Sequence, residues 1–413
     1  MSARKKIVFV VNYFYPDLAS TGQLMTELCL ELQQDFEITV IAAQPGYAGE
    51  VIKKDLFFEK DKLENIEIIR LKLPPLNKNS KTSRLKYITS YFFLATSALL
   101  KERKIDIIFT ISQPPVLGGL IGSIGKLLKR SIHIYNIQDF NPEQAAVVSY
   151  TKNQTVLKLA KAIDKLTCRY ADNIILVGQD MKETLKHRFK NKNVPKHSVI
   201  NNWTDESEIL PLHKSHSVVA GFLMKYNLLN KFVVMYSGNL GLFYDLENIM
   251  KVAKEFEKID DLMFVFIGEG ALKQKMEEYA KINQVTNVLF LTYQPKEFIR
   301  YSLNAADLHL VVNQKGIKGI SVPSKIYGVM AAGKPILGVL EQGSEAARLI
   351  LESQAGVVVE PQEYNGIISS IDYFYKQDKE TLEKMGRNGR LYLENYFTKQ
   401  ASINKYRILF KSY

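Results

Sequence analysis

Cysteine is scarce in this sequence. Only Cys29 and Cys168 occur among its 413 residues. A disulfide framework or a cysteine-based metal site needs several cysteines at characteristic spacings, and this pattern argues against both. The cysteine content is typical of a protein of the reducing cytoplasm.

Signals for export or membrane insertion are lacking as well. The apolar segment 7–11 follows three basic residues, but Asn12 ends it at once. It is too short for the apolar region of an export signal and suits a buried parallel strand better. The uncharged segment 87–100 would form a helix about 21 Å long, short of the roughly 30 Å hydrocarbon core of a membrane.

Common metal and phosphate motifs are also missing. No His or Cys residues have the spacing of metal ligands, and no Asp-x-Asp pair occurs. There is no Gly-x-x-x-x-Gly-Lys-Ser/Thr loop and no Gly-x-Gly-x-x-Gly fingerprint. The positive charge that an anionic ligand needs would therefore come from the protein itself.

Length and charge set the next limits. A chain of 413 residues fits two domains of about 200 residues each. Its content of 46% hydrophobic and 24% charged residues is that of a folded globular protein. The formal net charge of +12 suggests an anionic partner, which could be a nucleic acid, an acidic membrane or a phosphorylated substrate.

Apolar segments alternate with helical ones in the first half, which predicts a doubly wound parallel sheet. The expected strands are 7–11, 38–42, 66–71, 105–111, 132–137, 174–177 and 198–200. Ligands of such sheets bind beyond the carboxyl ends of the strands. That rule places Gly22, just ahead of the first helix, and Asp139 and Glu143 on a candidate active rim. Asp139 and Glu143 also fit a helix cap, and both interpretations stay open.

The segment 84–101 has basic residues at both ends and none in its middle. Arg84 and Lys86 precede the uncharged part, and Lys101, Arg103 and Lys104 follow it. As a helix it could lie in the domain core, or it could place a face on anionic lipid headgroups. One helix can do both, with a different face for each.

Three glycine-bearing turns follow strands in the second half. The expected strands are 232–236, 262–267, 288–291, 306–312, 336–339 and 356–359. The turns contain Gly238 and Gly241, Gly268 and Gly270, and Gly316 and Gly319. Three such turns at the carboxyl ends of one sheet favour a nucleotide-diphosphate site.

The third turn leads into the most informative stretch, 311–336. Ser321 is a plausible N-cap and Pro323 suits the first turn of a helix that ends at Gly333. Lys325 lies in the first turn, where free amide groups and the helix dipole attract anions. The alternative is an ordinary connection between a loop and a helix, with solvated lysines.

These pieces occur in the order found in glycosyltransferase family 4, which the chain resembles over nearly its whole length. The matching motifs are Tyr15-Pro-Asp with Gly22, Asp139 with Pro142-Glu143, Asn202-Trp-Thr-Asp205, Ser237-Gly-Asn-Leu-Gly241, Ile267-Gly-Glu-Gly270 and Val322-Pro-Ser-Lys-Ile-Tyr-Gly-Val-Met-Ala-Ala-Gly-Lys-Pro335. The last is highly specific. It resembles the branch that assembles capsule, O-antigen and colanic-acid-type polysaccharides.

The resemblance implies an α/β architecture, the GT-B fold, in which two Rossmann-like doubly wound domains face each other across a cleft. We expect an acceptor-binding domain over 1–205 and a nucleotide-sugar-binding domain over 206–395. A terminal helix over 396–413 would cross back to the first domain.

The resemblance also implies a donor site. Its base would lie near the second glycine turn, and its diphosphate near the first turn, Lys325 and the amides of 319–324. The residues assigned to the donor are Gly238, Asn239, Gly241, Gly268, Gly270, Tyr293, Gln294, Gly319, Ser321 and Ser324, with Gly22 close to the reaction centre.

The implied activity is a retaining transfer of a hexosyl or N-acetylhexosaminyl group. The donor would be a nucleotide-sugar, with a UDP-sugar expected, and the acceptor a lipid-linked saccharide. Lys325 would stabilise the departing diphosphate, so no cofactor or metal is needed, and Asp139 would orient or deprotonate the acceptor hydroxyl, with Glu143 beside it. We expect a cytoplasmic enzyme at the inner face of the cell membrane, held by basic and aromatic helices of its first domain.

The sequence departs from the family at two places. Most members carry two glutamates eight positions apart in the last motif, where this chain has Ile320 and Gly328. The basic pair usual after the first glycine turn is replaced by Leu242 and Phe243. The resemblance therefore does not assign a residue of this chain to the donor ribose. It does not assign the identities of the base and the sugar either.

Two other functions fit parts of the pattern. A GT-B nucleotide-sugar epimerase would have a similar donor domain, but it would have no use for the uncharged helix 87–100. A nucleic-acid-binding protein would explain the net charge, but the basic residues are scattered and no binding module is present. We therefore expect no nucleic acid among the partners.

Overall fold

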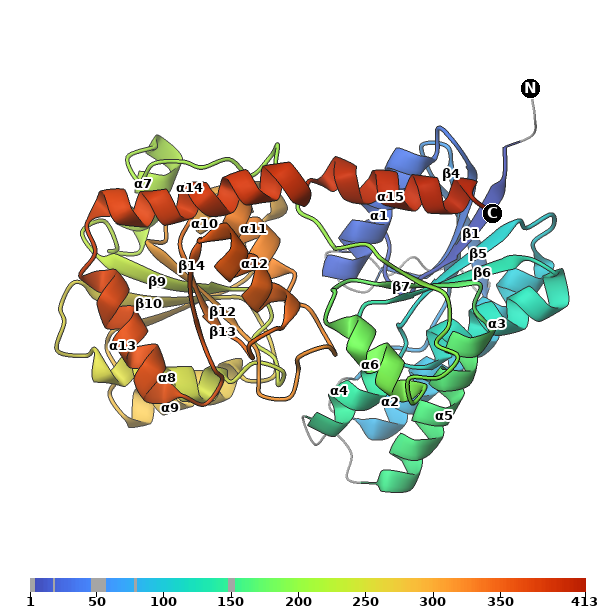
Figure 1. Ribbon diagram of the computed structural model, residues 1–413, viewed down its shortest axis with the longest axis horizontal. Helices are drawn as coiled ribbons and strands as arrows, with labels where there is room; N and C mark the ends of the chain where they lie inside the picture. Colours follow the sequence, from blue (N-terminus) through green and yellow to red (C-terminus); the bar gives the residue numbers. More distant parts are fainter. Residues whose placement is uncertain (1–3, 18, 46–56, 78–79, 148–152) are drawn as a thin grey trace. The chain divides into compact units, whose positions relative to one another are not determined.

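A computed structural model describes residues 4–17, 19–45, 57–77, 80–147 and 153–413. The chain divides into two compact units (Figure 1). The first comprises residues 1–201 and 403–413, and the second comprises residues 202–402. Each unit is built on one sheet with helices on both of its faces.

The first unit has an eight-stranded sheet with the order β3-β4-β2-β1-β5-β6-β7-β8. All neighbouring strands are parallel except β3 and β4. The strands are β1 (Lys6–Val10), β2 (Glu37–Ala43), β3 (Phe58–Leu63), β4 (Ile66–Leu71), β5 (Ile107–Ile111), β6 (Ile132–Ile137), β7 (Asn173–Leu176) and β8 (His197–Val199). The strand order reverses between β1 and β5, which is where doubly wound sheets bind ligands.

The central strands of this sheet are apolar along their length because helices cover both faces. Ile7 to Val10 of β1 are fully buried, and Ile7 pairs with Ile38 of β2 and Ile107 of β5. The edge strand β3 was not anticipated from the sequence. It reads Phe-Glu-Lys-Asp-Lys-Leu and none of its residues is fully buried, so it lacks the apolar pattern of a buried strand.

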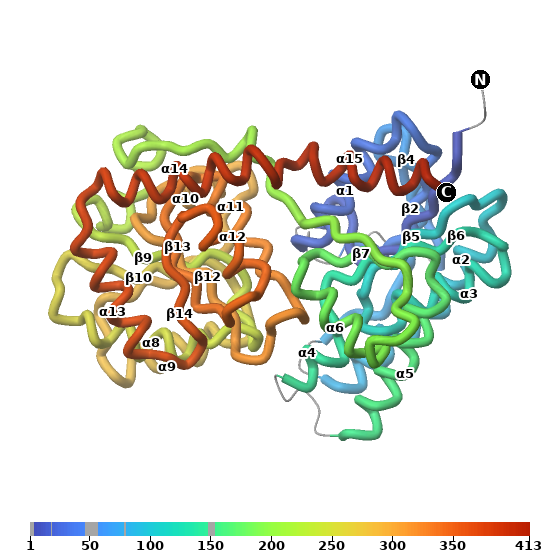
Figure 2. Tube along the Cα trace, viewed as in Figure 1, coloured from blue at the N-terminus to red at the C-terminus, as the bar shows by residue number. Residues whose placement is uncertain are grey.

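Seven helices accompany the sheet of the first unit in the part of the chain that the structure describes. They are α1 (Ser20–Leu32), α2 (Lys81–Lys101), α3 (Leu117–Lys129), α4 (Asn141–Val147), α5 (Gln154–Tyr170), α6 (Met181–Arg188) and the part of α15 (Lys399–Lys411) from Ile403 onward. Helices α2, α3 and α5 pack in a row on one face. Figure 2 shows α15 beside α1, and Phe410 of α15 packs on Phe9, Phe36 and Phe109.

Helix α2 contains the uncharged segment 87–100 and has two different faces. Tyr91, Ala95 and Leu99 are fully buried against the sheet. On its outer face Leu85 is 64% exposed and Phe93 is 69% exposed. One face of α2 therefore lies in the domain core, as the first interpretation expected. The other face is exposed on the surface of the unit. No helix among the described residues is long and apolar enough to cross a membrane.

The second unit has a six-stranded parallel sheet with the order β11-β10-β9-β12-β13-β14. Its strands are β9 (Phe232–Ser237), β10 (Leu262–Ile267), β11 (Val288–Leu291), β12 (Leu308–Val312), β13 (Ile336–Val339) and β14 (Gly356–Val359). The order reverses between β9 and β12. The turns with Gly238 and Gly316 follow these two strands directly, as the topological rule requires of a ligand site.

Helices cover both faces of this second sheet (Figure 1). One face carries α8 (Leu246–Glu255), α9 (Lys273–Ile282) and α13 (Tyr364–Tyr375), which share one apolar core with the strands. The other face carries α7 (Ser217–Lys225), the 3-10 turn Lys296–Phe298, α10 (Ile299–Asn304), α11 (Lys325–Ala331), α12 (Glu345–Ser353) and α14 (Lys379–Tyr396).

Two local expectations were wrong. Gly22 does not lie in a loop ahead of the first helix but inside α1, where a Cβ would come within 3.0 Å of the Cβ of Tyr13. Ser321 does not cap a helix, because α11 begins only at Lys325 and Ser324 precedes it without a capping side-chain bond. Ser321 instead belongs to a turn ahead of α11. In this turn the amides of Ile320 and Ser321 both donate to the carbonyl oxygen of Ile317.

Candidate active site

The first two glycine turns of the second unit are in direct contact. Gly268 has φ +150°, and a Cβ there would lie 1.9 Å from the carbonyl oxygen of Gly238. A Cβ on Gly270 would lie 2.2 Å from the carbonyl oxygen of Leu240. The amide of Gly238 donates to Ile267 at 2.9 Å. Only glycine allows this approach of two backbones, so these glycines are needed for the shape of the sheet edge.

Asn239 lies between the same two turns. Its side-chain amide would be 2.8 Å from a Cβ on Gly241 and 2.7 Å from one on Gly270. Asn239 is itself exposed, so the edge presents a polar amide above closely packed glycines. The structure thus brings together four of the glycines assigned to the donor from the sequence.

The third glycine turn is joined to the first through backbone. The amide of Gln314, just after β12, donates to the carbonyl oxygen of Phe243 at 2.8 Å. Glu341, which the sequence did not single out, holds the turn from its other side. Its carboxylate accepts the amides of Gly316 and Lys318, both at 2.9 Å. Glu341 follows β13, so a third neighbouring strand contributes to this edge.

Lys325 reaches the first glycine turn from α11. A Cβ on Gly238 would lie 3.3 Å from its Cε and 3.4 Å from its Nζ. The residue as a whole is partly exposed, but its Nζ is buried and has no hydrogen-bond acceptor among the described residues. Burial lowers the pKa of this ammonium group well below its usual value of 10.5. The alternative interpretation, a connection with solvated lysines, therefore does not hold for Lys325.

Two tyrosines that were not anticipated surround this ammonium group. Its Nζ lies 3.6 Å from the ring centroid of Tyr236 and 4.2 Å from that of Tyr244. Tyr236 is the fifth residue of β9, and its hydroxyl donates to the carbonyl oxygen of Asn239 at 2.8 Å. A tyrosine on each side of a glycine turn was the available signal in the sequence.

Tyr293 and Gln294 follow β11 at the edge of the same sheet. The ring of Tyr293 would be 3.5 Å from a Cβ on Gly268, and its hydroxyl donates to the carbonyl oxygen of Glu269 at 3.3 Å. Tyr293 is 49% exposed, so its ring is accessible beside the second glycine turn. The Gln294 side chain donates to the carbonyl oxygen of Thr292 at 3.0 Å.

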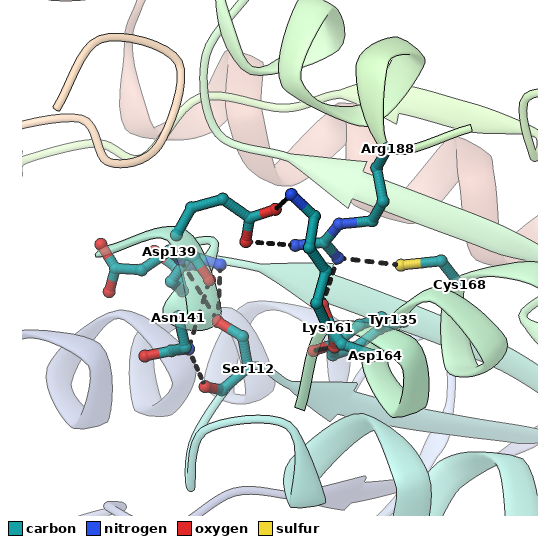
Figure 3. Close-up of polar contacts among 10 residues, drawn as sticks. Ser112, Tyr135, Asp139, Asn141, Lys161, Asp164, Cys168 and Arg188 are labelled. Atoms are coloured by element: carbon teal, nitrogen blue, oxygen red, sulfur yellow. Dashed lines mark hydrogen bonds and ion pairs between the residues drawn. The ribbon is translucent and has the colours of Figure 1, made fainter. Parts of the chain in front are cut away.

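In the first unit, Asp139 follows β6 in a loop that is well fixed. The hydroxyl of Ser112 accepts the amides of Gln138 and Asp139 at 3.1 and 3.3 Å. Asn141 donates to the carbonyl oxygens of Ser112 and Asp139 at 2.6 and 3.2 Å (Figure 3). The Asp139 carboxylate accepts from Gln144 at 3.3 Å and is partly exposed. This loop holds a carboxylate at the carboxyl end of a central strand.

Glu143 has a different environment, although it is only four residues further on. One oxygen of its carboxylate pairs with Arg188 at 2.6 Å, and the other pairs with Lys161 at 3.2 Å. Arg188 has a fully buried side chain and also pairs with Asp164. Figure 3 shows Arg188 among Lys161, Asp164 and Cys168. These pairs join α4, α5 and α6.

Arg188 is the centre of this network. Its guanidinium carbon lies 4.6 Å from the ring centroid of Phe140. Asp164 also accepts the hydroxyl of Tyr135 at 2.8 Å. Burial opposes the charge on Arg188, but Asp164 and Glu143 outweigh it and raise the pKa of the guanidinium above its usual value. The cation is therefore matched by two carboxylates.

Part of the chain matches a known protein family. Residues 222–392 match the family described as glycosyl transferases group 1. A relative from Pseudomonas aeruginosa, the probable glycosyltransferase WbjE, is 28% identical over 414 residues, covering 97% of this chain and 96% of its own. WcaI of Escherichia coli, a putative colanic acid biosynthesis glycosyl transferase, is 24% identical and covers 89% of this chain and 91% of its own.

Solved structures of the same fold extend over both units. Sucrose-phosphate synthase of Thermosynechococcus elongatus has a TM-score of 0.77 at 15% identity and covers 99% of this chain and 100% of its own. Anabaena HepE, in complex with UDP and glucose, has a TM-score of 0.71 at 14% identity with the same coverage. The chain therefore has the GT-B fold of glycosyltransferases, and residues 222–392 are similar to the group 1 family.

Proposed function

We propose that this chain transfers a hexosyl or N-acetylhexosaminyl group from a nucleotide-diphosphate donor to a lipid-linked saccharide, with retention of anomeric configuration. The proposed product is a cell-surface polysaccharide of the capsule or O-antigen type. Its support is the similarity to WbjE, a probable glycosyltransferase, and to WcaI, a putative colanic acid biosynthesis glycosyl transferase. A UDP-sugar is the proposed donor. HepE, a structural neighbour, was solved with UDP and glucose.

The environment of Lys325 is the observation that carries this proposal. A buried ammonium group without an acceptor lies against closely packed glycine turns at the topological switch point of the sheet. A diphosphate at this edge would supply the missing acceptor and would receive a full positive charge. In the transfer, Lys325 stabilises the negative charge that develops on the departing diphosphate. The proposed mechanism draws this charge from the protein, so we expect activity to survive chelation of divalent metals.

The proposed acceptor side uses Asp139. Its carboxylate is partly exposed at the end of β6, and its proposed role is to orient or deprotonate the acceptor hydroxyl. Glu143 is paired through both of its oxygens, and we assign it the role of holding α4 in place. Asp139→Asn should lower turnover while the donor affinity stays unchanged, whereas equal activity of this variant would remove Asp139 from the mechanism.

A panel of UDP-, GDP- and dTDP-sugars tests the donor site. A specific donor raises the melting temperature because it binds the folded state only. Lys325→Met should abolish that increase and lower turnover about 100-fold or more, the scale found when one such stabilising group is removed. Lys334→Met is the matched control, because Lys334 is a second lysine whose pKa burial lowers, to about 8, outside the glycine turns.

The products decide between the proposal and its alternatives. Proton NMR of the new glycosidic bond should show the anomeric configuration of the donor. Enzyme mixed with donor alone should leave the sugar unchanged, whereas conversion to an epimer would establish an epimerase instead. Lys325→Met with wild-type donor binding and turnover would refute the donor site.

We also propose that the first unit docks on the inner face of the cell membrane. Helices α2, α3 and α5 pack in a row and expose apolar side chains among basic ones. Half-exposed to largely exposed apolar residues are Leu85 and Phe93 on α2, Leu127 and Leu128 on α3, and Val156, Leu159, Leu166 and Tyr170 on α5. Basic residues of α5 between them are Lys158, Lys161, Lys165 and Arg169. Such a surface suits anionic headgroups over an apolar layer.

Sedimentation with vesicles tests this surface. Wild-type protein should bind vesicles that contain phosphatidylglycerol and should bind neutral phosphatidylcholine vesicles weakly. Leu159→Glu should reduce this binding strongly because it places a like charge against the anionic headgroups. Ile408→Glu is the control, since Ile408 is 70% exposed on α15 of the same unit. Equal binding by both variants would refute the assignment of this face.

A further inference from the structure

The ammonium group of Lys325 is held between two aromatic rings. Its distances to the ring centroids of Tyr236 and Tyr244, 3.6 and 4.2 Å, are well within the roughly 6 Å at which a ring face attracts a cation. The two centroids are 6.0 Å apart, with an angle of 61° between the ring planes. The rings therefore provide the attraction that a carboxylate would usually give a buried cation.

The two tyrosines flank the first glycine turn, with Tyr236 in β9 before it and Tyr244 after it. Tyr236 precedes Gly238 and donates its hydroxyl to the Asn239 carbonyl oxygen, while the amide of Tyr244 donates to the carbonyl oxygen of Gly241 at 3.3 Å. Burial raises the pKa of Tyr236 well above its usual value, so its hydroxyl stays a donor. A shift of this turn therefore moves both rings and the site of the lysine together.

Aromatic rings differ from a carboxylate in a way that matters for an anion site. A carboxylate would neutralise the ammonium group and would compete with a diphosphate for its three donors. A ring face lowers the cost of burying the charge but accepts no conventional hydrogen bond. Rings of this kind would leave the donors of the ammonium group to a ligand.

We propose that Tyr236 and Tyr244 are positioning residues that hold the Lys325 ammonium group, protonated and unneutralised, against the glycine turn for the donor diphosphate. This proposal rests on the donor-binding role of Lys325 proposed above. It adds two residues to the donor site and gives a reason why this site contains a lysine without an acidic partner.

The pair Tyr244→Met and Tyr244→Phe tests the proposal. Tyr244 is only half-buried, and methionine keeps much of its volume without an aromatic face. In Tyr244→Met, kcat/KM for the donor should fall about tenfold, and the high-pH limb of its pH profile should move about one pH unit lower. Tyr244→Phe keeps the ring and should retain both values. An unmoved limb in Tyr244→Met would overturn the proposal.

Tyr236→Phe separates the ring from the hydroxyl. It keeps the aromatic face over Lys325 but removes the hydrogen bond to Asn239, so the donor KM should rise while the high-pH limb stays in place. Tyr301→Leu is the control variant. Its ring lies 4.9 Å from the guanidinium carbon of Arg300 on α10, and its removal should leave donor kinetics unchanged.

A measurement on the wild-type protein keeps the test independent of variant folding. In protein labelled with carbon-13 lysine, the Cε protons of Lys325, assigned with Lys325→Met, should be shifted upfield by the two rings. If these protons had no upfield shift, the proposed position of Lys325 between the two rings would be wrong. Full turnover in Lys325→Met would instead refute the donor role of Lys325. An inactive Lys325→Met together with normal kinetics in Tyr244→Met would refute only the positioning role of the tyrosines.

Discussion

Two cationic side chains of this molecule are removed from water next to aromatic rings, and their partners differ. Arg188 in the first unit lies over Phe140 and pairs with Asp164 and Glu143. Lys325 in the second unit lies between two tyrosine rings and has no acceptor among the residues that the structure describes. Carboxylates thus neutralise the buried cation in the first unit, whereas none pairs with the cation in the second unit among the described residues.

The difference separates a structural ion from a candidate ligand-binding ion. A buried charge that is paired with opposite charges can join elements of the fold, and Arg188 joins α4, α5 and α6 through Glu143 and Asp164. A buried charge without a partner lowers stability, and such groups concentrate at functional sites. The burial of a cation is therefore less informative than the question of what neutralises it.

The sharpest test of the comparison is Arg188→Met. Removing the guanidinium leaves Asp164 and Glu143 without their buried partner, and we expect the free energy of unfolding to fall by about 3–5 kcal/mol. Urea unfolding followed by circular dichroism measures this loss. Lys186→Met, on the same helix but in an exposed pair with Glu183, should change it by less than about 0.5 kcal/mol. A small loss for Arg188→Met would mean that the network is not structural.

Lys325→Met should behave in the opposite way. Methionine fills the space between the two rings without a charge that lacks an acceptor. We expect the free energy of unfolding to stay the same or to increase by up to about 2 kcal/mol, while turnover falls about 100-fold. The same urea titration checks it. A loss of stability comparable to that of Arg188→Met would place Lys325 among the structural ions.

The pH dependence of stability gives a further contrast. Burial lowers the pKa of Lys325 in the folded state below the value of 10.5 expected after unfolding. Between these two values the unfolded chain binds more protons, so stability rises with pH, by at most about 1.4 kcal/mol per unit for one group. Below the pKa of Lys325 in the folded state, the loss of stability caused by burying the charged lysine has its full value and no longer changes with pH.

A second lysine contributes to the same pH range, so a difference curve is needed. Burial lowers the pKa of Lys334 to about 8, which adds a rise in stability between about pH 8 and 10.5. Subtracting the Lys325→Met curve from that of the wild type isolates Lys325. The difference in unfolding free energy between the two proteins should decrease as the pH rises toward 10.5. A constant difference would show that folding does not shift the pKa of Lys325.

Much of the fold followed from local sequence pattern. Apolar strands such as 132–137 and 262–267 were correctly predicted, because a parallel sheet covered on both faces requires continuous apolar segments. The contact of the first two glycine turns also followed, since parallel strands end at one edge. The edge strand β3 was missed because its charged residues face water.

The site was predictable only in part, for a different reason. Gly238 and Gly268 were found because their backbone conformations, with φ +142° and +150°, restrict the residue type. The pairing of Glu143 with Arg188 joins residues 45 positions apart, and no local spacing encodes it. The burial of Lys325 was missed because loop lysines are usually solvated, and only the fold reveals the two rings around it.

The smallest expected effect separates the two partners of Glu143. Lys161 pairs with this carboxylate at 3.2 Å, but its side chain is 51% exposed, so water screens the interaction. We expect Lys161→Met to lower the free energy of unfolding by less than about 1 kcal/mol, against the several kcal/mol lost in Arg188→Met. Urea titrations of both variants at two salt concentrations measure the contrast, and only the Lys161 contribution should decrease with salt. Because one carboxylate serves both cations, equal losses would show that burial does not decide the strength of these pairs.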